Sequence, residues 1–224
     1  MPRNVAEGER LRSRRRKKEA RALSPTQVRS LLSSARGIRN EALYVVAVHT
    51  GLRQGELLGL RRSDMDLEAS KLSVARSLKV TADGLAFGAP KNQASRRSVP
   101  LNKSVTSALR AHKMRQNKEW LSASDWHDHD LVFPNHLGRP TDHNNLYYRE
   151  FKPLLKDAGL GDKGFTFHSL RHTFATALVK QRQHPKIVQS LLSHASITQT
   201  MDTYSHLLED IGGDAVDGLD DAFG

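Results

Sequence analysis

The chain of 224 residues contains no cysteine. This absence excludes disulfide bonds, catalytic thiolates, and zinc or iron–sulfur sites built on cysteine, so a metal site would depend on His, Asp and Glu. The sequence also lacks a run of roughly 18 or more apolar residues, which excludes a membrane-spanning helix, and its N-terminus lacks the apolar segment of a secretory signal peptide. We therefore expect a globular cytoplasmic protein, associated with the nucleoid, with no membrane partner.

Positive charge is in excess and unevenly distributed. The chain carries 35 Lys and Arg against 24 Asp and Glu, a formal net charge of +11. Residues 1–22 hold nine of the cations and three Glu, whereas residues 205–224 hold six acidic residues and neither Lys nor Arg. The cationic body favours a polyanionic partner such as nucleic acid, because each neutralised phosphate releases counterions. A merely solvated, highly charged surface is the alternative.

Helical patterns cover most of the chain. Ser24, Pro25 and Gln27 form a capping box with Pro at the first helical position, and an apolar helix ends near Gly51. Helices are predicted over residues 24–35, 41–48, 56–60, 102–120, 142–159, 168–180 and 184–192, and from residue 196 onward. Alternating residues predict three short antiparallel strands over 72–78, 85–87 and 97–101, with residues 90–93 in the turn between the second and third. The predicted fold class is mainly α with a small three-stranded antiparallel β-sheet (α+β).

Several residues are candidates for chemistry, although each has an ordinary structural explanation. His168, Arg171 and His172 project to overlapping faces of one helix. Histidines four residues apart suggest zinc, but Ser169 stands where the zincin pattern requires Glu, so a helix with incidental histidines is favoured over a zinc site. Beside a phosphate, Arg supplies a donor fork and His a titratable proton carrier.

Three further candidates are weak individually. Tyr204 lies on the apolar face of its predicted helix, which favours a packed core tyrosine. Lys91 at a turn favours a solvated charge, and Arg53 has Glu56 as an ion-pair partner one turn on.

Five segments nevertheless occur together in the order and approximate spacing of the phage integrase, or tyrosine recombinase, family. They are TGLRQGEL (50–57), PK (90–91), HSLRHT (168–173), LSH (192–194) and TMDTYSH (200–206). Over about residues 24–208 the chain resembles the catalytic domain of that family. The resemblance implies the tyrosine recombinase catalytic-domain fold and a site-specific recombinase that cleaves double-stranded DNA through a covalent 3′-phosphotyrosyl intermediate, without a metal or nucleotide cofactor.

The resemblance also assigns residue roles. Arg53 is the first catalytic arginine, Lys91 the hairpin lysine, His168 and Arg171 the His-x-x-Arg pair, His194 the second histidine, and Tyr204 the nucleophile. Two departures from the family pattern are Ser169, where an acidic residue is common, and Ser193, which replaces the usual glycine before the second histidine. Glycine permits backbone conformations that serine resists, so Ser193 affects the expected geometry near His194.

By this resemblance the chain divides into a basic arm or linker (1–23), a catalytic domain (24–208) and an acidic tail (209–224). We expect a homotetramer on DNA in which the tail docks in trans on a neighbouring catalytic domain. Family members usually carry a core-binding domain before the catalytic domain, so we expect this chain to be the catalytic half.

The alternatives are a type IB topoisomerase, a catalytically idle DNA-binding remnant of a mobile element and a His-based metal hydrolase. The arm residues expected to contact DNA are Arg10, Arg12, Arg14, Arg15, Arg16, Lys17, Lys18 and Arg21.

Overall fold

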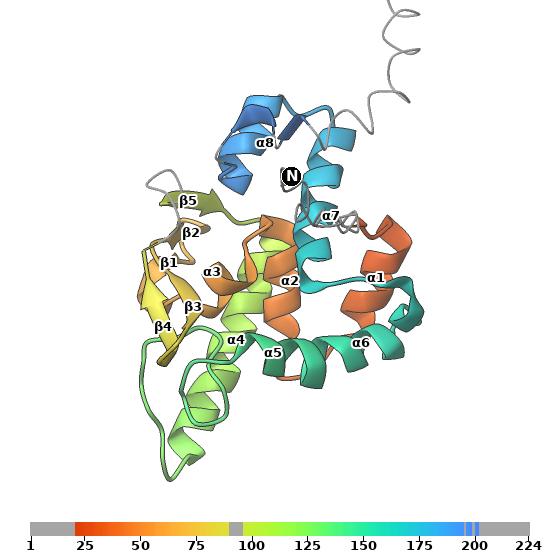
Figure 1. The fold of residues 1–224 in the computed structure, drawn as a ribbon. Coiled ribbons are helices and arrows are strands. Elements are labelled where there is room, and N and C mark those ends of the chain that lie inside the picture. Colours follow the sequence, from red (N-terminus) through yellow and green to blue (C-terminus); the bar gives the residue numbers. More distant parts are fainter. Residues whose placement is uncertain (1–20, 90–95, 195, 199, 202–224) are drawn as a thin grey trace, which may run out of the picture.

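The computed structural model describes residues 21–89, 96–194, 196–198 and 200–201 (Figure 1). Helices make up most of this part of the chain, and the short strands lie together at one side of it (Figure 1). The helices are α1 (Pro25–Ser34), α2 (Glu41–Thr50), α3 (Gln54–Leu58), α4 (Lys103–Ser122), α5 (His143–Asn145), α6 (Lys152–Asp157), α7 (Phe167–Lys180) and α8 (Pro185–Leu192). A π-helical turn, η3 (Leu146–Phe151), joins α5 to α6, and the 3-10 turns are η1 (Arg62–Asp64) and η4 (Gly161–Lys163).

The ends of the first helices follow the capping signals of the sequence. At α1 the Ser24 hydroxyl accepts from the Gln27 backbone N–H at 3.2 Å, and the Ser24 N–H donates to Gln27 Oε1 at 2.8 Å. Helix α2 ends at Gly51, whose φ of 62° lies in the left-handed region. The predicted capping box and glycine stop are both confirmed.

The strands form two small antiparallel sheets. Strands β1 (Met65–Asp66), β2 (Lys71–Val74) and β5 (Arg97–Pro100) make a three-stranded sheet in the order β1-β2-β5. Strands β3 (Ser77–Thr81) and β4 (Gly84–Gly88) make a separate hairpin. The mainly α class with a three-stranded antiparallel sheet is confirmed, but the predicted membership of that sheet is wrong.

The predicted strand over residues 72–78 is in fact divided between the two sheets. The division falls at Ala75 and Arg76. The Arg76 side chain donates from Nε to the carbonyl oxygen of Gly59 at 2.8 Å, and its guanidinium lies 4.0 Å from the centre of the Phe87 ring. These contacts engage Arg76 with the end of α3 and with β4, so the chain leaves the β2 ladder before β3 begins. Alternating hydrophobicity does not reveal such a break, because Leu72, Val74 and Leu78 are all buried.

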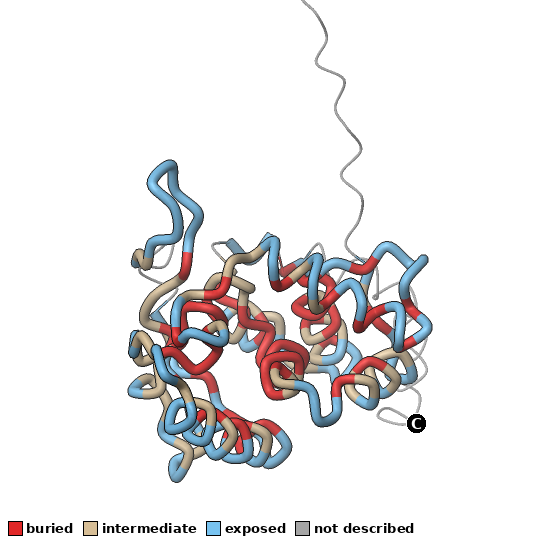
Figure 2. The backbone as a smooth tube through the Cα atoms, turned by 90° about the horizontal axis from the view of Figure 1, so that it is seen from below, coloured by how far each residue is buried: buried red, intermediate tan, exposed pale blue. Residues whose placement is uncertain are grey.

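Helix α2 lies at the centre of the fold and packs against both α4 and α7. Seven of its ten residues are buried, and in Figure 2 the buried segments lie in the interior with exposed chain around them. Tyr44 of α2 stacks on Phe151, with ring centroids 5.9 Å apart, and Phe151 packs edge-on against Phe167 at the start of α7. This aromatic chain connects α2 with the helix that carries the His-x-x-Arg pair. None of the helices in the described part of the chain combines the length and apolar composition required to cross a membrane.

Candidate active site

A small polar cavity of about 100 Å³ lies where the loop after α2, helix α7 and the end of α8 meet. A water molecule occupies about 30 Å³ of the liquid, so this volume suits a few waters or one phosphate-sized anion. The structure brings together four of the six predicted catalytic residues here. The residues that line the cavity are Arg53, His168, Arg171, His172, Ala175, Leu192 and His194.

Arg171 is buried, and its guanidinium bridges two elements. Nη1 donates to the Gly51 carbonyl oxygen at 2.6 Å, and Nη2 donates to the Leu192 carbonyl oxygen at the end of α8. Burial, followed by the charge of Arg53, lowers the pKa of Arg171 to about 9, so this side chain is still a cation at neutral pH. The fixed guanidinium is therefore a preorganised donor at the cavity wall.

Arg53 precedes α3 and is held by both a carboxylate and a carbonyl. Its Nη1 donates to Glu56 Oε1 at 2.9 Å and its Nη2 to the Ser193 carbonyl oxygen at 3.1 Å. The predicted Arg53–Glu56 pair is present. About 40% of the Arg53 side chain is exposed, compared with 3% for Glu56. The Arg53 side chain is therefore accessible to solvent, whereas the Glu56 carboxylate that it binds is buried.

The three histidines of the cavity differ in their partners. His168 and His172 meet edge to face, with ring centroids 4.7 Å apart, and His194 Nδ1 lies 2.9 Å from the Thr200 hydroxyl oxygen. Partial burial, and then the surrounding positive charge, lowers the pKa of both His168 and His194 to about 4. Both rings are therefore neutral at pH 7. Among the described residues, no three His, Asp or Glu side chains are grouped to hold a metal ion.

The two departures from the family pattern have clear structural positions. Ser169 is buried in the first turn of α7, where its hydroxyl accepts from the Thr166 backbone N–H at 3.1 Å and so caps the helix. Ser193 follows α8 with φ 52° and ψ 50°, a left-handed conformation that favours glycine. Ser193 thus adopts the conformation that glycine would favour, although its side chain resists it.

Two buried charged residues complete the surroundings of Arg53. Glu56 also accepts from Arg97 of β5, at 3.1 Å between Nη2 and Oε2. Burial alone would raise the pKa of Glu56, but the charge and hydrogen bond of Arg97, followed by Arg53, lower it below its ordinary value. Sequence analysis missed Arg97. One signal was available, since Arg97 alternates in phase with the buried Val99 and Leu101.

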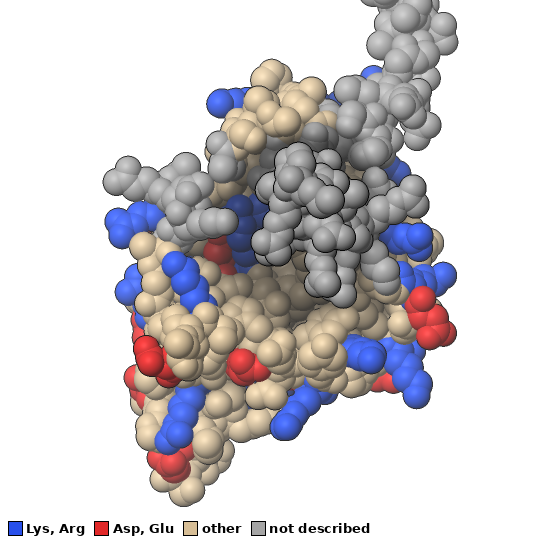
Figure 3. All heavy atoms as spheres, viewed as in Figure 1, with Lys and Arg blue, Asp and Glu red and all other residues tan. Residues whose placement is uncertain are grey.

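Other predicted residues cannot be placed. Lys91, which falls between β4 and β5, and Tyr204 lie outside the described residues, as do the arm cations from Arg10 to Lys18. Arg21 is described and exposed. On the face that Figure 3 shows, Lys and Arg side chains lie among acidic ones, and basic and acidic atoms are side by side at the edge of a central hollow.

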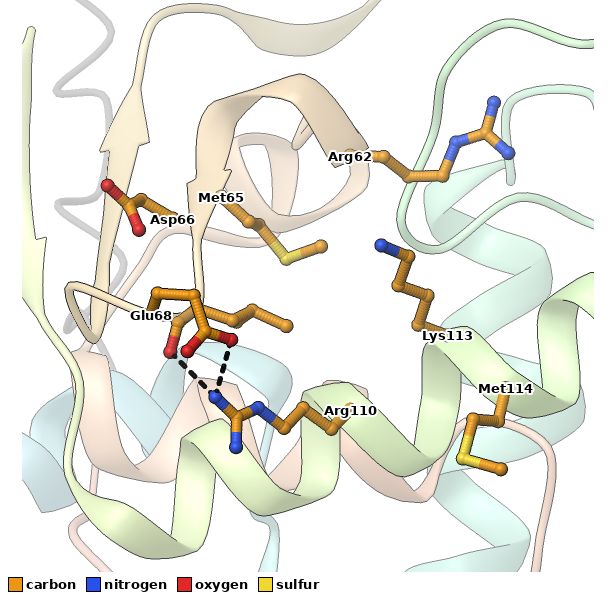
Figure 4. A pocket seen from close by; sticks show the side chains of 8 residues that line it. Arg62, Met65, Asp66, Glu68, Arg110, Lys113 and Met114 are labelled. Atoms are coloured by element: carbon orange, nitrogen blue, oxygen red, sulfur yellow. Dashed lines mark hydrogen bonds and ion pairs between the residues drawn. The ribbon is translucent and has the colours of Figure 1, made fainter.

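A larger groove of about 720 Å³ lies between β1 and α4 and shares no residue with the site. Its arginines are already paired. Arg110 donates to the Leu67 carbonyl oxygen and to Glu68 (Figure 4), and Arg62 pairs with Asp128 and Asp130. Two of the three cationic side chains of the groove are thus engaged with carboxylates, and Lys113 is the third.

Comparison with known proteins agrees with the motifs. Residues 21–210 match the phage integrase family. The chain belongs to this family. A "tyrosine recombinase XerC-like" protein of Caldanaerobacter subterraneus is 34% identical over 218 residues, which cover 92% of this chain and 55% of the relative. The tyrosine recombinase XerD of Halalkalibacterium halodurans is 32% identical, over 85% of this chain and 58% of the relative. The chain spans little more than half the length of these curated relatives.

Solved structures of the family share the fold. The Tn1549 transposon integrase in complex with circular intermediate DNA superposes with a TM-score of 0.68 and 27% identity, covering 82% of this chain and 62% of the integrase chain. The XerA recombinase superposes with a TM-score of 0.69 and 27% identity, covering 86% of this chain and 63% of its own. The predicted family and catalytic-domain fold are confirmed.

Proposed function

We propose that this chain is the catalytic part of a site-specific recombinase that cleaves and rejoins double-stranded DNA through a 3′-phosphotyrosyl bond at Tyr204. The observation that carries the proposal is the convergence of two arginines and three histidines on one phosphate-sized cavity. The names of its relatives and the DNA bound to the Tn1549 integrase support the same function.

The side chains of the cavity suit a phosphoryl transition state. A pentavalent phosphorus carries negative charge on its non-bridging oxygens, and fixed donors stabilise that charge. Arg53, Arg171 and His194 are those donors in our proposal. If His194 Nδ1 accepts from the Thr200 hydroxyl, the proton stays on Nε2, which then donates to the phosphate. His168, neutral at pH 7 because of its lowered pKa, accepts a proton from Tyr204.

The proton balance of the step assigns the two remaining residues. The Tyr204 oxygen attacks phosphorus and gives up its proton to His168, so a P–O bond to tyrosine forms as the bond to the 5′ oxygen breaks. Lys91 gives a proton to that 5′ oxygen, since an unprotonated alkoxide leaves poorly. A 5′-hydroxyl from another strand reverses the step without ATP. Exchange of the attacking strand is recombination.

The assembly is also part of the proposal. Four copies bind two duplexes, and the acidic tail of residues 209–224 docks in trans on a neighbouring cationic catalytic domain. The basic arm, residues 1–23, binds phosphates beside the site in a salt-dependent manner.

The test is to trap the covalent adduct. The protein is incubated with nicked duplexes made from DNA that flanks its gene, and protein–DNA adducts are resolved on a denaturing gel with and without EDTA. We expect an adduct that EDTA does not diminish. Absence of both an adduct and DNA cleavage would favour an idle DNA-binding protein, and DNA cleavage that leaves no adduct and that EDTA abolishes would favour a metal hydrolase. A strand-exchange assay then separates recombinase from topoisomerase, which only reseals the same strand.

A further inference from the structure

Three consecutive carbonyls at the end of α8 each accept a hydrogen bond from a different arginine. The last carbonyls of a helix lack partners within the helix, and cations are favourable there. The left-handed Ser193 ends α8 just before His194. The bonds run from Arg97 Nε to Leu191 O at 3.0 Å, from Arg171 Nη2 to Leu192 O, and from Arg53 Nη2 to Ser193 O at 3.1 Å.

Arg97 differs from the other two arginines because it does not line the cavity. It comes from β5, opposite Val74 of β2 in the three-stranded sheet. Only 8% of its side chain is exposed. A buried guanidinium needs acceptors for its donors, and Arg97 finds them in α8 and in Glu56.

Glu56 connects Arg97 to Arg53. Its Oε2 accepts from Arg97 Nη2 at 3.1 Å and from the Arg53 backbone N–H at 3.0 Å, while Oε1 accepts from Arg53 Nη1 at 2.9 Å. One buried carboxylate thus fixes both the backbone and the guanidinium of Arg53. Because Arg97 donates to both oxygens of that carboxylate, it limits where Glu56, and with it Arg53, can lie.

We propose that Arg97 is a positioning residue that lies outside the cavity. It holds Arg53 in place through Glu56, and it holds the end of α8, which leads to His194, through the Leu191 carbonyl. The inference rests on the proposed function for its effect on cleavage, whereas the geometry it assigns to Arg53 is independent of that function. Arg97 contacts the lining residues and not the phosphate.

The distinguishing substitution is Arg97→Lys. Lysine keeps the positive charge but has one ammonium group, which cannot bind Leu191 O and both oxygens of Glu56 in the same fork geometry. Arg96, the preceding residue, is exposed, so Arg96→Lys is a matched control for the same chemical change one position away. Thermal unfolding of both variants reports whether a change in cleavage reflects loss of folded protein.

Two measurements test the proposal. The first is the single-turnover rate of covalent adduct formation, measured beside the dissociation constant for the duplex. Loss of a residue that orients reacting groups lowers rates by about 10- to 100-fold, so we expect that decrease for Arg97→Lys, with duplex affinity close to wild type. The melting temperature is expected to fall by several degrees, because lysine leaves at least one buried acceptor without its partner, and the rate is therefore measured at a temperature where the variant is fully folded. Arg96→Lys is expected to match wild type throughout. A rate for Arg97→Lys equal to wild type, or one lowered only in proportion to lost folded protein, would overturn the proposal.

The second measurement does not depend on catalysis. Paired guanidinium groups rotate slowly, which gives separate NMR signals for Nη1 and Nη2 of Arg53. We expect the separate signals in wild type and in Arg96→Lys, and a single averaged signal in Arg97→Lys. If wild type forms no adduct with any duplex, the proposed function fails while this measurement still decides the positioning role. Unchanged Arg53 signals in Arg97→Lys would refute it.

Discussion

Replacing Arg171 with lysine separates the charge of this residue from its geometry. The Arg171 guanidinium joins the Gly51 carbonyl at the end of α2 to the Leu192 carbonyl at the end of α8. A lysine ammonium retains the cation, but it cannot reach both carbonyls and still direct a donor into the cavity. At least one buried carbonyl therefore loses its partner.

The expected magnitudes follow from the two roles of Arg171. An unsatisfied buried acceptor costs about 1–3 kcal/mol, which for a domain of this size lowers the melting temperature by about 2–4 °C for each kcal/mol. Loss of one transition-state donor costs about 2.7–4 kcal/mol of activation free energy, or roughly 100- to 1,000-fold in rate. The rate is thus expected to suffer more than the stability.

The assay compares melting followed by circular dichroism with single-turnover adduct formation at a temperature where each variant is folded. Arg29→Lys, at an exposed position on α1, is the control and is expected to behave as wild type in both. Adduct formation by Arg171→Lys at the wild-type rate would show that charge alone suffices. It would refute the argument from the two carbonyls.

Three other predictions use adduct trapping or urea denaturation. Tyr204→Phe is expected to abolish the covalent adduct while duplex affinity stays near wild type, and any adduct that survives denaturation would end the nucleophile assignment. Gly51→Ala is expected to destabilise the fold by about 2–4 kcal/mol, because its φ is 62° and a Cβ would collide with the Phe174 ring; unchanged urea denaturation would contradict this. Because the pKa values of His168 and His194 are lowered from about 6.5 to about 4, the unfolded state binds more protons between these values and stability is lost as pH falls through that range. Inorganic phosphate should reduce this loss by raising both pKa values, and identical urea midpoints at pH 7 and pH 4.5 would argue against it.

Local signals were sufficient to predict much of the fold and part of the site. The α1 capping box, the Gly51 stop and the His168–Arg171 spacing all depend on residues within one or two helical turns, where sequence separation determines geometry. The Arg53–Glu56 ion pair is of the same kind, since the two residues are three apart in the chain. The order of the motifs resembles that of the family, and this resemblance predicted that segments distant in the sequence contribute to one site.

Long-range hydrogen bonds to backbone carbonyls were not predictable in the same way. Arg97 and Glu56 are 41 residues apart, and Arg97 reaches Leu191 across 94 residues. A carbonyl is present at every residue, so no residue type marks Leu191 or Leu192 as an acceptor. The break between β2 and β3 was missed for a similar reason, because it depends on the bond from Arg76 to the Gly59 carbonyl.

Ser193, which replaces the usual glycine of the family, is expected to lower the stability of the fold. It occupies the left-handed position after α8, where a side chain costs roughly 1–2 kcal/mol and glycine adds about 0.5–1 kcal/mol of entropy to the unfolded chain. We therefore expect Ser193→Gly to stabilise the fold by about 0.5–1 kcal/mol, with cleavage unaffected because the carbonyl that accepts from Arg53 keeps its position. Ser193→Ala retains the backbone strain and removes only the hydroxyl, so it should not be stabilised. A lower melting temperature for Ser193→Gly, matched by Ser193→Ala, would show that the contacts of the hydroxyl outweigh the strain at this turn.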